Sequence, residues 1–290
     1  MDHYCVLGNP IEHSKSPQIH ARFAELTGQT IDYARQWVAL DGFADMLQAL
    51  QQGHAAPFRG CNVTVPFKFE AYQAANTFTD RAQLAQAANT LRFEAAGVMA
   101  DNTDGIGLVN DLQNNAGVAL AGLDILLLGA GGAAAGVLGP LMATGPRRLV
   151  VANRSPDKAE ALVARHKQHP SMQALLLKTE LVSQSIRRPE GRFDVIINAT
   201  ATSMAGAESP VPPDVLKPGA LAYDLMYGTA SASFMQWARG HGAEARDGLG
   251  MLVEQAAEAF EWWRGVRPPS AQVLAELRAS QGAAAPLPTP

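Results

Sequence analysis

The sequence lacks the features of a membrane protein, a nucleic-acid-binding protein or a secreted protein. No apolar run reaches the roughly 20 residues that span a bilayer. The chain opens on Met-Asp-His-Tyr-Cys with no basic segment ahead of an apolar stretch, so a signal peptide is not expected. A formal net charge of −4 gives no electrostatic reason to expect nucleic acid or an anionic membrane as a partner. We therefore expect a cytoplasmic protein.

Cysteine is also scarce, and the histidines are dispersed. Cys5 and Cys61 stand alone in strand-like segments, and there is no C-x-x-C pair. The seven histidines are expected to be solvated surface residues, and the closest pair, His166 and His169, lies in a polar helix-end stretch. The sequence therefore predicts neither a disulfide framework nor a catalytic metal.

The composition is that of a globular protein with a full core. Of the 290 residues, 47% are hydrophobic and 17% are charged, and this length allows one large domain or two of ordinary size.

Short apolar runs alternate with helix-like segments along the whole chain, which predicts an α/β protein with mainly parallel sheets. In the first part the expected strands are residues 4–7, 31–38 and 60–63, and the expected helices are 16–28 and 41–52, with Pro66 opening a further helix. In the second part the expected strands are 124–128, 149–152, 195–198 and 220–223, with a small-residue helix after the first, a helix from Ser155-Pro156, and a helix over 249–264.

A glycine-rich turn lies in the middle of the chain, so about 100 residues must form a separate unit before it. We expect a substrate-binding and catalytic domain over 1–104, completed by C-terminal helices within 252–281. A nucleotide-binding domain is expected over 105–251. The Ala- and Pro-rich residues 282–290 are expected to form a frayed tail.

The turn matches the dinucleotide-binding fingerprint G-x-G-x-x-G/A. It runs Gly129-Ala130-Gly131-Gly132-Ala133-Ala134, after a predicted strand and before a predicted helix. Gly129 permits the tight turn, Gly131 allows the backbone to approach a pyrophosphate, and Ala134 allows close packing of helix on strand. The helix N-terminus then offers unpaired N–H groups to the phosphates. This pattern predicts a Rossmann-type domain.

The residues after the next strand indicate which dinucleotide binds. NAD enzymes usually carry Asp or Glu there to hold the ribose 2′-hydroxyl. This chain has Asn153-Arg154-Ser155, followed by Lys158, and these cations attract a 2′-phosphate. Ser155 is also expected to cap the following helix, but capping does not explain the missing acid. We therefore predict NADP.

Hydride transfer also needs a group that exchanges a proton with the substrate oxygen. The Tyr-x-x-x-Lys dyad of short-chain dehydrogenases is absent. Other motifs are candidates, and they are residues 8–17 (Gly-Asn-Pro-Ile-Glu-His-Ser-Lys-Ser-Pro), 62–68 (Asn-Val-Thr-Val-Pro-Phe-Lys), 88–90 (Ala-Asn-Thr), 102–105 (Asn-Thr-Asp-Gly) and 247–252 (Asp-Gly-Leu-Gly-Met-Leu). With the glycine turn, these motifs resemble those of the shikimate dehydrogenases in order and spacing, over about residues 4–280.

The resemblance implies a two-domain α/β enzyme, an N-terminal substrate domain with a Rossmann-type NADP-binding domain. It implies the reversible reduction of 3-dehydroshikimate to shikimate with NADPH, a step toward the aromatic amino acids. The expected partners are this small substrate and the cofactor, with the protein a monomer or a homodimer.

The resemblance also implies residue roles. Lys68 and Asp104 match the catalytic pair, and we expect Lys68 to carry the proton while Asp104 positions it. The matches to substrate-binding residues are Ser14 and Ser16 for the carboxylate, and Thr64, Asn89, Tyr227 and Gln255 for other contacts. The matches to cofactor-binding residues are Asp80, Gly129, Ala130, Gly131, Gly132, Ala133, Asn153, Arg154, Ser155, Lys158, Leu225 and Gly248.

Taken singly, these residues have simpler interpretations. Lys68 could be a solvated helix lysine, Asp104 and Ser16 could be helix caps, and Asn62 and Asn89 could be strand-end turn residues. Only their joint occurrence favours a site.

Two segments depart from the family pattern. Residues 198–204 read Asn-Ala-Thr-Ala-Thr-Ser-Met, so Ala201 and Ser203 replace the expected Ser and Gly. Residues 228–233 lack the usual Thr-Pro. Both changes bear on cofactor affinity and loop closure and leave the proton-transfer pair intact.

Other functions remain open at this stage. A sister dehydrogenase acting on quinate or an aminated shikimate is the nearest alternative, although the two serines favour shikimate. A non-catalytic NADP-binding sensor would be expected to have lost Lys68 or Asp104. A tetrahydrofolate dehydrogenase has a related architecture, but the first-domain motifs do not fit it.

Overall fold

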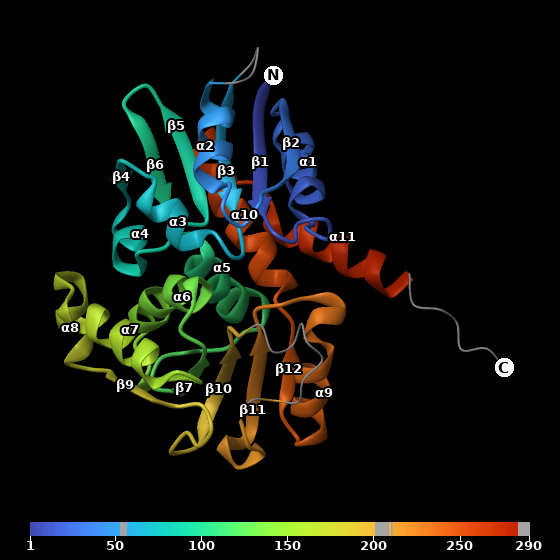
Figure 1. The fold of residues 1–290 in the computed structure, drawn as a ribbon. Coiled ribbons are helices and arrows are strands. Elements are labelled where there is room, and N and C mark those ends of the chain that lie inside the picture. The colour runs from blue at the N-terminus through green and yellow to red at the C-terminus, as the bar shows by residue number, and fades with distance from the viewer. Residues whose placement is uncertain (53–56, 201–208, 210, 284–290) are drawn as a thin grey trace.

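A computed structural model describes residues 1–52, 57–200, 209 and 211–283, which form two α/β units stacked on each other (Figure 1). The elements of the first part are β1 (Asp2–Gly8), α1 (Ser16–Thr27), β2 (Ile31–Trp37), α2 (Phe43–Gln52), β3 (Phe58–Val63), α3 (Lys68–Gln73), β4 (Thr77–Phe78), α4 (Asp80–Ala85), β5 (Thr90–Glu94), β6 (Gly97–Asp101) and α5 (Asp104–Asn110). Those of the second part are β7 (Asp124–Leu128), α6 (Gly132–Ala143), β8 (Arg148–Asn153), α7 (Pro156–Gln168), α8 (Gln173–Leu176), β9 (Glu180–Ser185), β10 (Phe193–Asn198), β11 (Leu216–Asp224), α9 (Ala232–Gly240), β12 (Glu244–Arg246), α10 (Leu249–Arg264) and α11 (Ser270–Ala283).

The first sheet is mixed. Its strand order is β2-β1-β3-β5-β6-β4, and β5 runs antiparallel to both β3 and β6. Three of its five strand pairings are parallel, so the expectation of mainly parallel sheets is confirmed, and β5 is the antiparallel exception. The β5–β6 hairpin turns within two residues, Ala95 and Ala96, ahead of Gly97 at φ +126°. An Ala-Ala-Gly turn is not among the strong hairpin signals, so little in the sequence indicates this hairpin.

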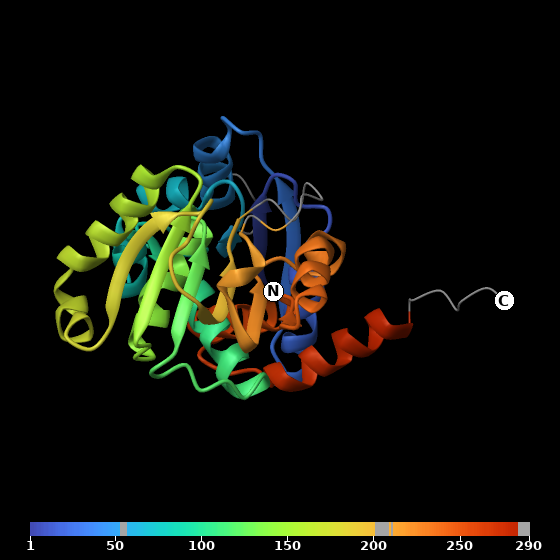
Figure 2. The same ribbon diagram turned by 90° about the horizontal axis from the view of Figure 1, so that it is seen from below.

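The second sheet is fully parallel and has the order β12-β11-β10-β7-β8-β9. Read from β7, this is the 3-2-1-4-5-6 order of dinucleotide-binding folds, which confirms the predicted Rossmann-type architecture. Side chains alternate along β7: Ile125 and Leu127 pack with α6 and α7, whereas Leu126 and Leu128 pack on the face covered by α9. In Figure 2 these helices lie on opposite sides of the sheet.

The C-terminal helices return to the first unit. Phe260 of α10 and Leu277 of α11 share a core with Ile19 and Phe23 of α1. Figure 1 shows α5 and α6 between the two sheets, and α10 running from there along the back of the first sheet. The chain thus crosses between the units at α5 and again at α10, and side chains on these two helices are placed to face a cleft.

All seven strands expected from the sequence are present, but several expected details are wrong. Ser16 is the first residue of α1 and not its cap, since the N-cap position is Lys15. Pro66 precedes α3, which begins at Lys68. Cys5 and Cys61 do not stand alone, because they are register partners on β1 and β3, both as free buried thiols.

Two histidines are also not solvated surface. His166 is fully buried, with Nδ1 2.9 Å from the Leu162 carbonyl oxygen, and His20 is fully buried against Tyr33. Helical spacing places both on inward faces, which their polar neighbours in sequence conceal.

Within the described residues, no helix is long and apolar enough to cross a membrane. The described residues also contain no group of three or more His, Cys, Asp or Glu placed to hold a metal ion.

Candidate active site

A cavity of about 320 Å³ lies between the two units. All eight residues predicted as catalytic or substrate-binding line it, and they are Ser14, Ser16, Thr64, Lys68, Asn89, Asp104, Tyr227 and Gln255. They come from loops, from the starts of α1, α3 and α5, and, for Gln255, from the interior of α10. The cavity also includes Leu225, Gly248 and Ala133 from the second unit, so both units contribute to one cleft.

Lys68 and Asp104 form an ion pair inside this cavity. Lys68 Nζ lies 2.5 Å from Asp104 Oδ2, and the two side chains are 12% and 2% exposed. Lys68 is the first residue of α3 and Asp104 the first residue of α5. A short, charge-assisted bond shielded from water is a route along which a proton can move. Lys68 is therefore not a solvated helix lysine.

Gly132 of the nucleotide turn lies against the Lys68 side chain. A Cβ added at Gly132 would lie 3.1 Å from Lys68 Cβ. The glycine therefore lets the lysine pass close to the start of α6, which brings the proton-transfer pair next to the fingerprint turn.

Asn89 holds the other oxygen of the catalytic carboxylate. Its Nδ2 donates to Asp104 Oδ1 at 2.9 Å, and it also lies 2.9 Å from Thr103 Oγ1 and 2.6 Å from Gln255 Oε1. An amide nitrogen carries only two hydrogens, so these three acceptors compete. A ligand hydroxyl that binds Asn89 would take the place of one of them.

Ser14 and Ser16 form a hydroxyl pair at the other end of the cavity. Ser14 Oγ donates to Ser16 Oγ at 3.1 Å and accepts from the Ser16 backbone N–H at 3.3 Å. Arg35 holds this loop, since its Nε and Nη2 donate to the Ser14 carbonyl oxygen at 2.9 and 2.6 Å. Burial raises the pKa of the Tyr227 hydroxyl, which keeps it a hydrogen-bond donor at neutral pH. Three hydroxyls backed by a cation suit a carboxylate.

Asn62 lines the cavity too, although it was not among the predicted site residues. Tyr33 donates its hydroxyl to Asn62 Oδ1 at 2.7 Å, and Asn62 Nδ2 donates to Thr90 Oγ1 at 3.0 Å and to the Asn89 carbonyl oxygen at 3.2 Å. Its position could have been predicted from the sequence. Asn62 is two residues before Thr64, and alternate residues of an extended chain point to the same face.

The fingerprint turn has the backbone that a dinucleotide requires. Gly129 adopts φ +111°, and an added Cβ would lie 3.0 Å from the Ala199 carbonyl oxygen. Gly131 is the N-cap of α6, and nothing lies within 4 Å of its added Cβ. The approach to the N-terminus of α6 is therefore open over Gly131.

A second cavity of about 400 Å³ adjoins this turn. It is lined by the predicted cofactor residues Ala130, Gly131, Asn153, Arg154, Ser155 and Lys158, together with Phe69, Ala161, Leu162 and Arg165. Among these lining residues there are three cations and no carboxylate. Ser155 occupies the N-cap of α7, yet its side chain makes no capping hydrogen bond, so the hydroxyl is left for a ligand. This donor set fits a 2′-phosphorylated dinucleotide.

The remaining cofactor predictions have different positions. Leu225 and Gly248 line the first cavity, and an added Cβ at Gly248 would lie 2.3 Å from the Leu225 carbonyl oxygen, so only glycine fits there. Asp80 is exposed at the start of α4 and lines neither cavity. Ala201 and Ser203 lie outside the described residues. Arg165 was not predicted, because it stands two helical turns beyond Lys158 and outside the recognised motif.

The fold and the two adjoining cavities define a dinucleotide-dependent dehydrogenase with separate nucleotide and substrate units. Family models match most of the chain: the shikimate dehydrogenase substrate binding domain over residues 6–91, shikimate / quinate 5-dehydrogenase over 111–208, and the shikimate 5′-dehydrogenase C-terminal domain over 248–278. A relative from Acidovorax sp. (strain JS42), named shikimate dehydrogenase (NADP(+)), is 62% identical over 284 residues and covers 98% of each chain. The chain therefore belongs to the shikimate dehydrogenase family.

Solved structures agree with this assignment. The structure of an Ael1 enzyme from Pseudomonas putida superimposes with a TM-score of 0.83 at 44% identity, covering 96% of this chain and 98% of that one. Shikimate 5-dehydrogenase from Thermus thermophilus, in complex with NADP(H) and shikimate, gives a TM-score of 0.81 at 29% identity, covering 97% of this chain and 100% of that one.

Proposed function

We propose that this protein catalyses the reversible, NADPH-dependent reduction of 3-dehydroshikimate to shikimate, a step in the formation of chorismate and the aromatic amino acids. The observation that carries the proposal is the water-shielded Lys68–Asp104 pair inside a cleft that also contains a hydroxyl cluster and adjoins the nucleotide turn. Relatives named shikimate dehydrogenase (NADP(+)) that are 50–62% identical support the same reaction.

NADP is the cofactor of this reaction. When bound, the reduced nicotinamide supplies the hydride that reduces the ketone. Gly129 to Ala133 would receive the pyrophosphate at the start of α6. Arg154, Lys158 and the free Ser155 hydroxyl would hold the 2′-phosphate, and Asn153 orients this loop through its bond to the Ser155 carbonyl oxygen at 2.9 Å. Leu225 and Gly248 line the cleft on the side of the second unit. Asp80 stays a sequence prediction.

Lys68 protonates the substrate oxygen from Nζ as the ketone is reduced, and takes the proton back in the reverse direction. Asp104 orients the ammonium group and stabilises its charge, while Asn89 holds the second carboxylate oxygen. Burial of the pair keeps water from competing for this bond.

The substrate carboxylate is assigned to Ser14, Ser16 and Tyr227, and the ring hydroxyls to Thr64, Asn89 and Gln255. Each of these side chains donates or accepts without a net charge, so each substrate hydroxyl can be recognised by direction as well as by distance.

We also propose which unit binds which ligand. Residues 1–104 with 252–281, which include most of α10 and α11, would bind the substrate, and residues 105–251 would bind NADP. The shared core of α1, α10 and α11 supports the first assignment. The expected tail, 282–290, lies almost entirely outside the described residues. We infer a cytoplasmic enzyme that acts as a monomer or a homodimer.

The experiment is the replacement of Lys68 by Met and of Asp104 by Asn, with Lys158→Met as a matched loss of a lysine at the cofactor side. We expect Lys68→Met to lower kcat by about 10²–10⁴-fold with little change in the KM for shikimate, which is the usual worth of a positioned acid–base group. Lys158→Met should instead raise the KM for NADP. If Lys68→Met kept most of kcat while the KM for shikimate rose, the lysine would bind substrate and the proton would come from another group.

A further inference from the structure

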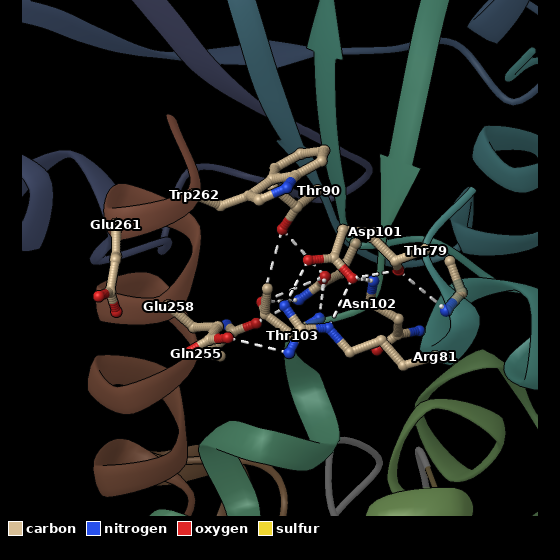
Figure 3. A network of polar contacts seen from close by, with 12 residues as sticks. Thr79, Arg81, Thr90, Asp101, Asn102, Thr103, Gln255, Glu258, Glu261 and Trp262 are labelled. Carbon is tan, nitrogen blue, oxygen red and sulfur yellow. Dashed lines mark hydrogen bonds and ion pairs between the residues drawn. The ribbon is translucent and has the colours of Figure 1, made fainter. Parts of the chain in front are cut away.

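A second ion network lies beside the active site and contacts neither cavity. Arg81, in the first turn of α4, donates from Nε to Asp101 Oδ1 at 2.6 Å and from Nη2 to Asp101 Oδ2 at 2.5 Å. Its third nitrogen, Nη1, donates to Glu258 Oε1 at 2.9 Å (Figure 3). None of these three residues lines either cavity. One guanidinium therefore joins α4, the end of β6 and α10.

We call the two bonds from Arg81 to Asp101 the Asp101 arm, and the bond from Arg81 to Glu258 the Glu258 arm. The Asp101 arm fixes the position at which the chain enters α5. Asp101 is the last residue of β6 and is fully buried. Its Oδ1 also accepts from the Thr79 hydroxyl at 2.6 Å and from the Asn102 backbone N–H at 2.7 Å. Asn102 Oδ1 in turn accepts from the Asp104 backbone N–H at 3.2 Å. Asp104, which carries the catalytic carboxylate, is three residues after Asp101. The backbone between them is held by the hydrogen bonds from the Asn102 and Asp104 N–H groups.

The Glu258 arm fixes α10. Glu258 lies three residues after Gln255, so the two side chains are neighbours on one face of the helix. Holding Glu258 therefore holds the height and rotation at which Gln255 enters the cleft.

The two segments held by Arg81, the start of α5 and the helix α10, are also linked inside the active site by Asn89. Asn89 Nδ2 lies 2.9 Å from Asp104 Oδ1 and 2.6 Å from Gln255 Oε1, so one amide group spans the start of α5 and α10. A shift of α10 relative to the β6–α5 loop would break one of these contacts.

We propose that Arg81 is a positioning residue that sets the spacing between Asp104 and Gln255, and thereby places the proton-transfer pair against the substrate-binding amides. This inference rests on the proposed function. An arginine is required because three of its nitrogens, in one plane, reach two carboxylates at the same time; a lysine offers a single point charge.

Three variants test this role. Arg81→Met removes both arms, Arg81→Lys keeps the charge without the planar fork, and Glu258→Ala removes the Glu258 arm but leaves the buried Arg81–Asp101 pair paired. Glu258 also forms an ion pair with Arg267, at 2.7 Å. Glu261→Ala is therefore the matched control, because Glu261 lies on α10 and pairs with Arg267 at 3.1 Å, but has no ion pair with Arg81. Glu258→Ala keeps the test open if Arg81→Met fails to fold.

The two arms should give different kinetic signatures. We expect Arg81→Met and Arg81→Lys to lower kcat by about 10- to 100-fold, since misplacement of a reacting group by about 1 Å has an effect of that size. Glu258→Ala should raise the KM for shikimate about 5-fold with kcat nearly retained, as loss of a bond through a displaced amide predicts. The Kd for NADPH, measured by fluorescence titration, should stay within about twofold of wild type in every variant, and Glu261→Ala should behave as wild type.

Equal kcat and KM in all variants would overturn the proposal. So would a kcat that falls only in proportion to the fraction of folded protein measured by circular dichroism, because that is the result of a purely structural ion pair. These results are distinct from those expected if the proposed reaction itself were wrong, because the wild-type protein would then not turn over shikimate at all.

Discussion

Two buried histidines should make the protein sensitive to mild acid. Burial lowers the pKa of His20 to about 3 and that of His166 to about 4, from an ordinary value of about 6.5. At pH 5 both side chains are therefore neutral in the folded protein. In the unfolded chain each would bind a proton at that pH. Unfolding then takes up protons, so the free energy of unfolding falls as the pH is lowered from about 6.5 toward 4.

The loss of stability depends on how far the pH falls below the ordinary histidine pKa of about 6.5. Each histidine removes about 1.4 kcal/mol of stability per pH unit, so at pH 5 each has removed about 2 kcal/mol and the two together about 4 kcal/mol. Carboxylates titrate mainly below this range. A loss of about 4 kcal/mol is a large share of the 5–15 kcal/mol typical of a folded domain.

The assay is urea unfolding at about pH 7 and about pH 5, followed by tryptophan fluorescence. Trp263 is a suitable reporter because its ring centroid lies 5.6 Å from that of His20. His20→Phe should reduce the pH-dependent loss from about 4 to about 2 kcal/mol, since a phenyl ring can keep the stacking on Tyr33 at 4.2 Å. The exposed His241→Gln is the matched control. If His20→Phe lost as much stability between the two pH values as wild type, the burial argument would be refuted.

Three further predictions concern the cofactor, the core and the substrate. Arg154→Asp should raise the ratio of the Kd for NADP to that for NAD by about 100-fold, as removal of a phosphate-binding cation and repulsion by the new carboxylate imply, and an unchanged ratio in titrations would contradict this. Gly107→Ala should destabilise the protein by about 1–3 kcal/mol in thermal unfolding, because an added Cβ would lie 2.7 Å from a backbone nitrogen of α10. Gly240→Ala is the control and should leave the stability unchanged, because no atom lies within 4 Å of an added Cβ there. Arg35→Met should raise the KM for shikimate about 10-fold and leave kcat intact, since the side chain supports the Ser14 carbonyl and adds positive charge near the substrate carboxylate; a fall in kcat alone would disprove this role.

The sequence predicted the local parts of this molecule well. The fingerprint turn, the helix that follows it and the fully apolar strands of the second sheet depend on residues close together in the chain. The eight predicted catalytic and substrate-binding residues also line one cavity, and six of them, all except Tyr227 and Gln255, belong to recognised motifs near the end of a strand or the start of a helix. Elements with short, mixed or polar sequences were missed, such as the two-residue β4 and the polar β9.

Features that depend on tertiary neighbours could not be predicted in the same way. The pairing of Cys5 with Cys61 follows from strand order, which no local pattern encodes, and the stacking of His20 on Tyr33 depends on the packing of α1 against β2. Arg81 likewise lies outside every motif recognised in the sequence. Its two carboxylate partners lie 20 and 177 residues further along the chain.

Shikimate dehydrogenase activity is measured directly as the initial rate of nicotinamide reduction, followed by absorbance, when the purified protein is mixed with shikimate and NADP. Quinate and NAD are run in parallel, in all four combinations. We expect fast turnover with shikimate and NADP and much slower turnover with either replacement. Faster turnover with quinate or with NAD would contradict the assigned specificity, and no turnover in any combination would contradict the assigned reaction.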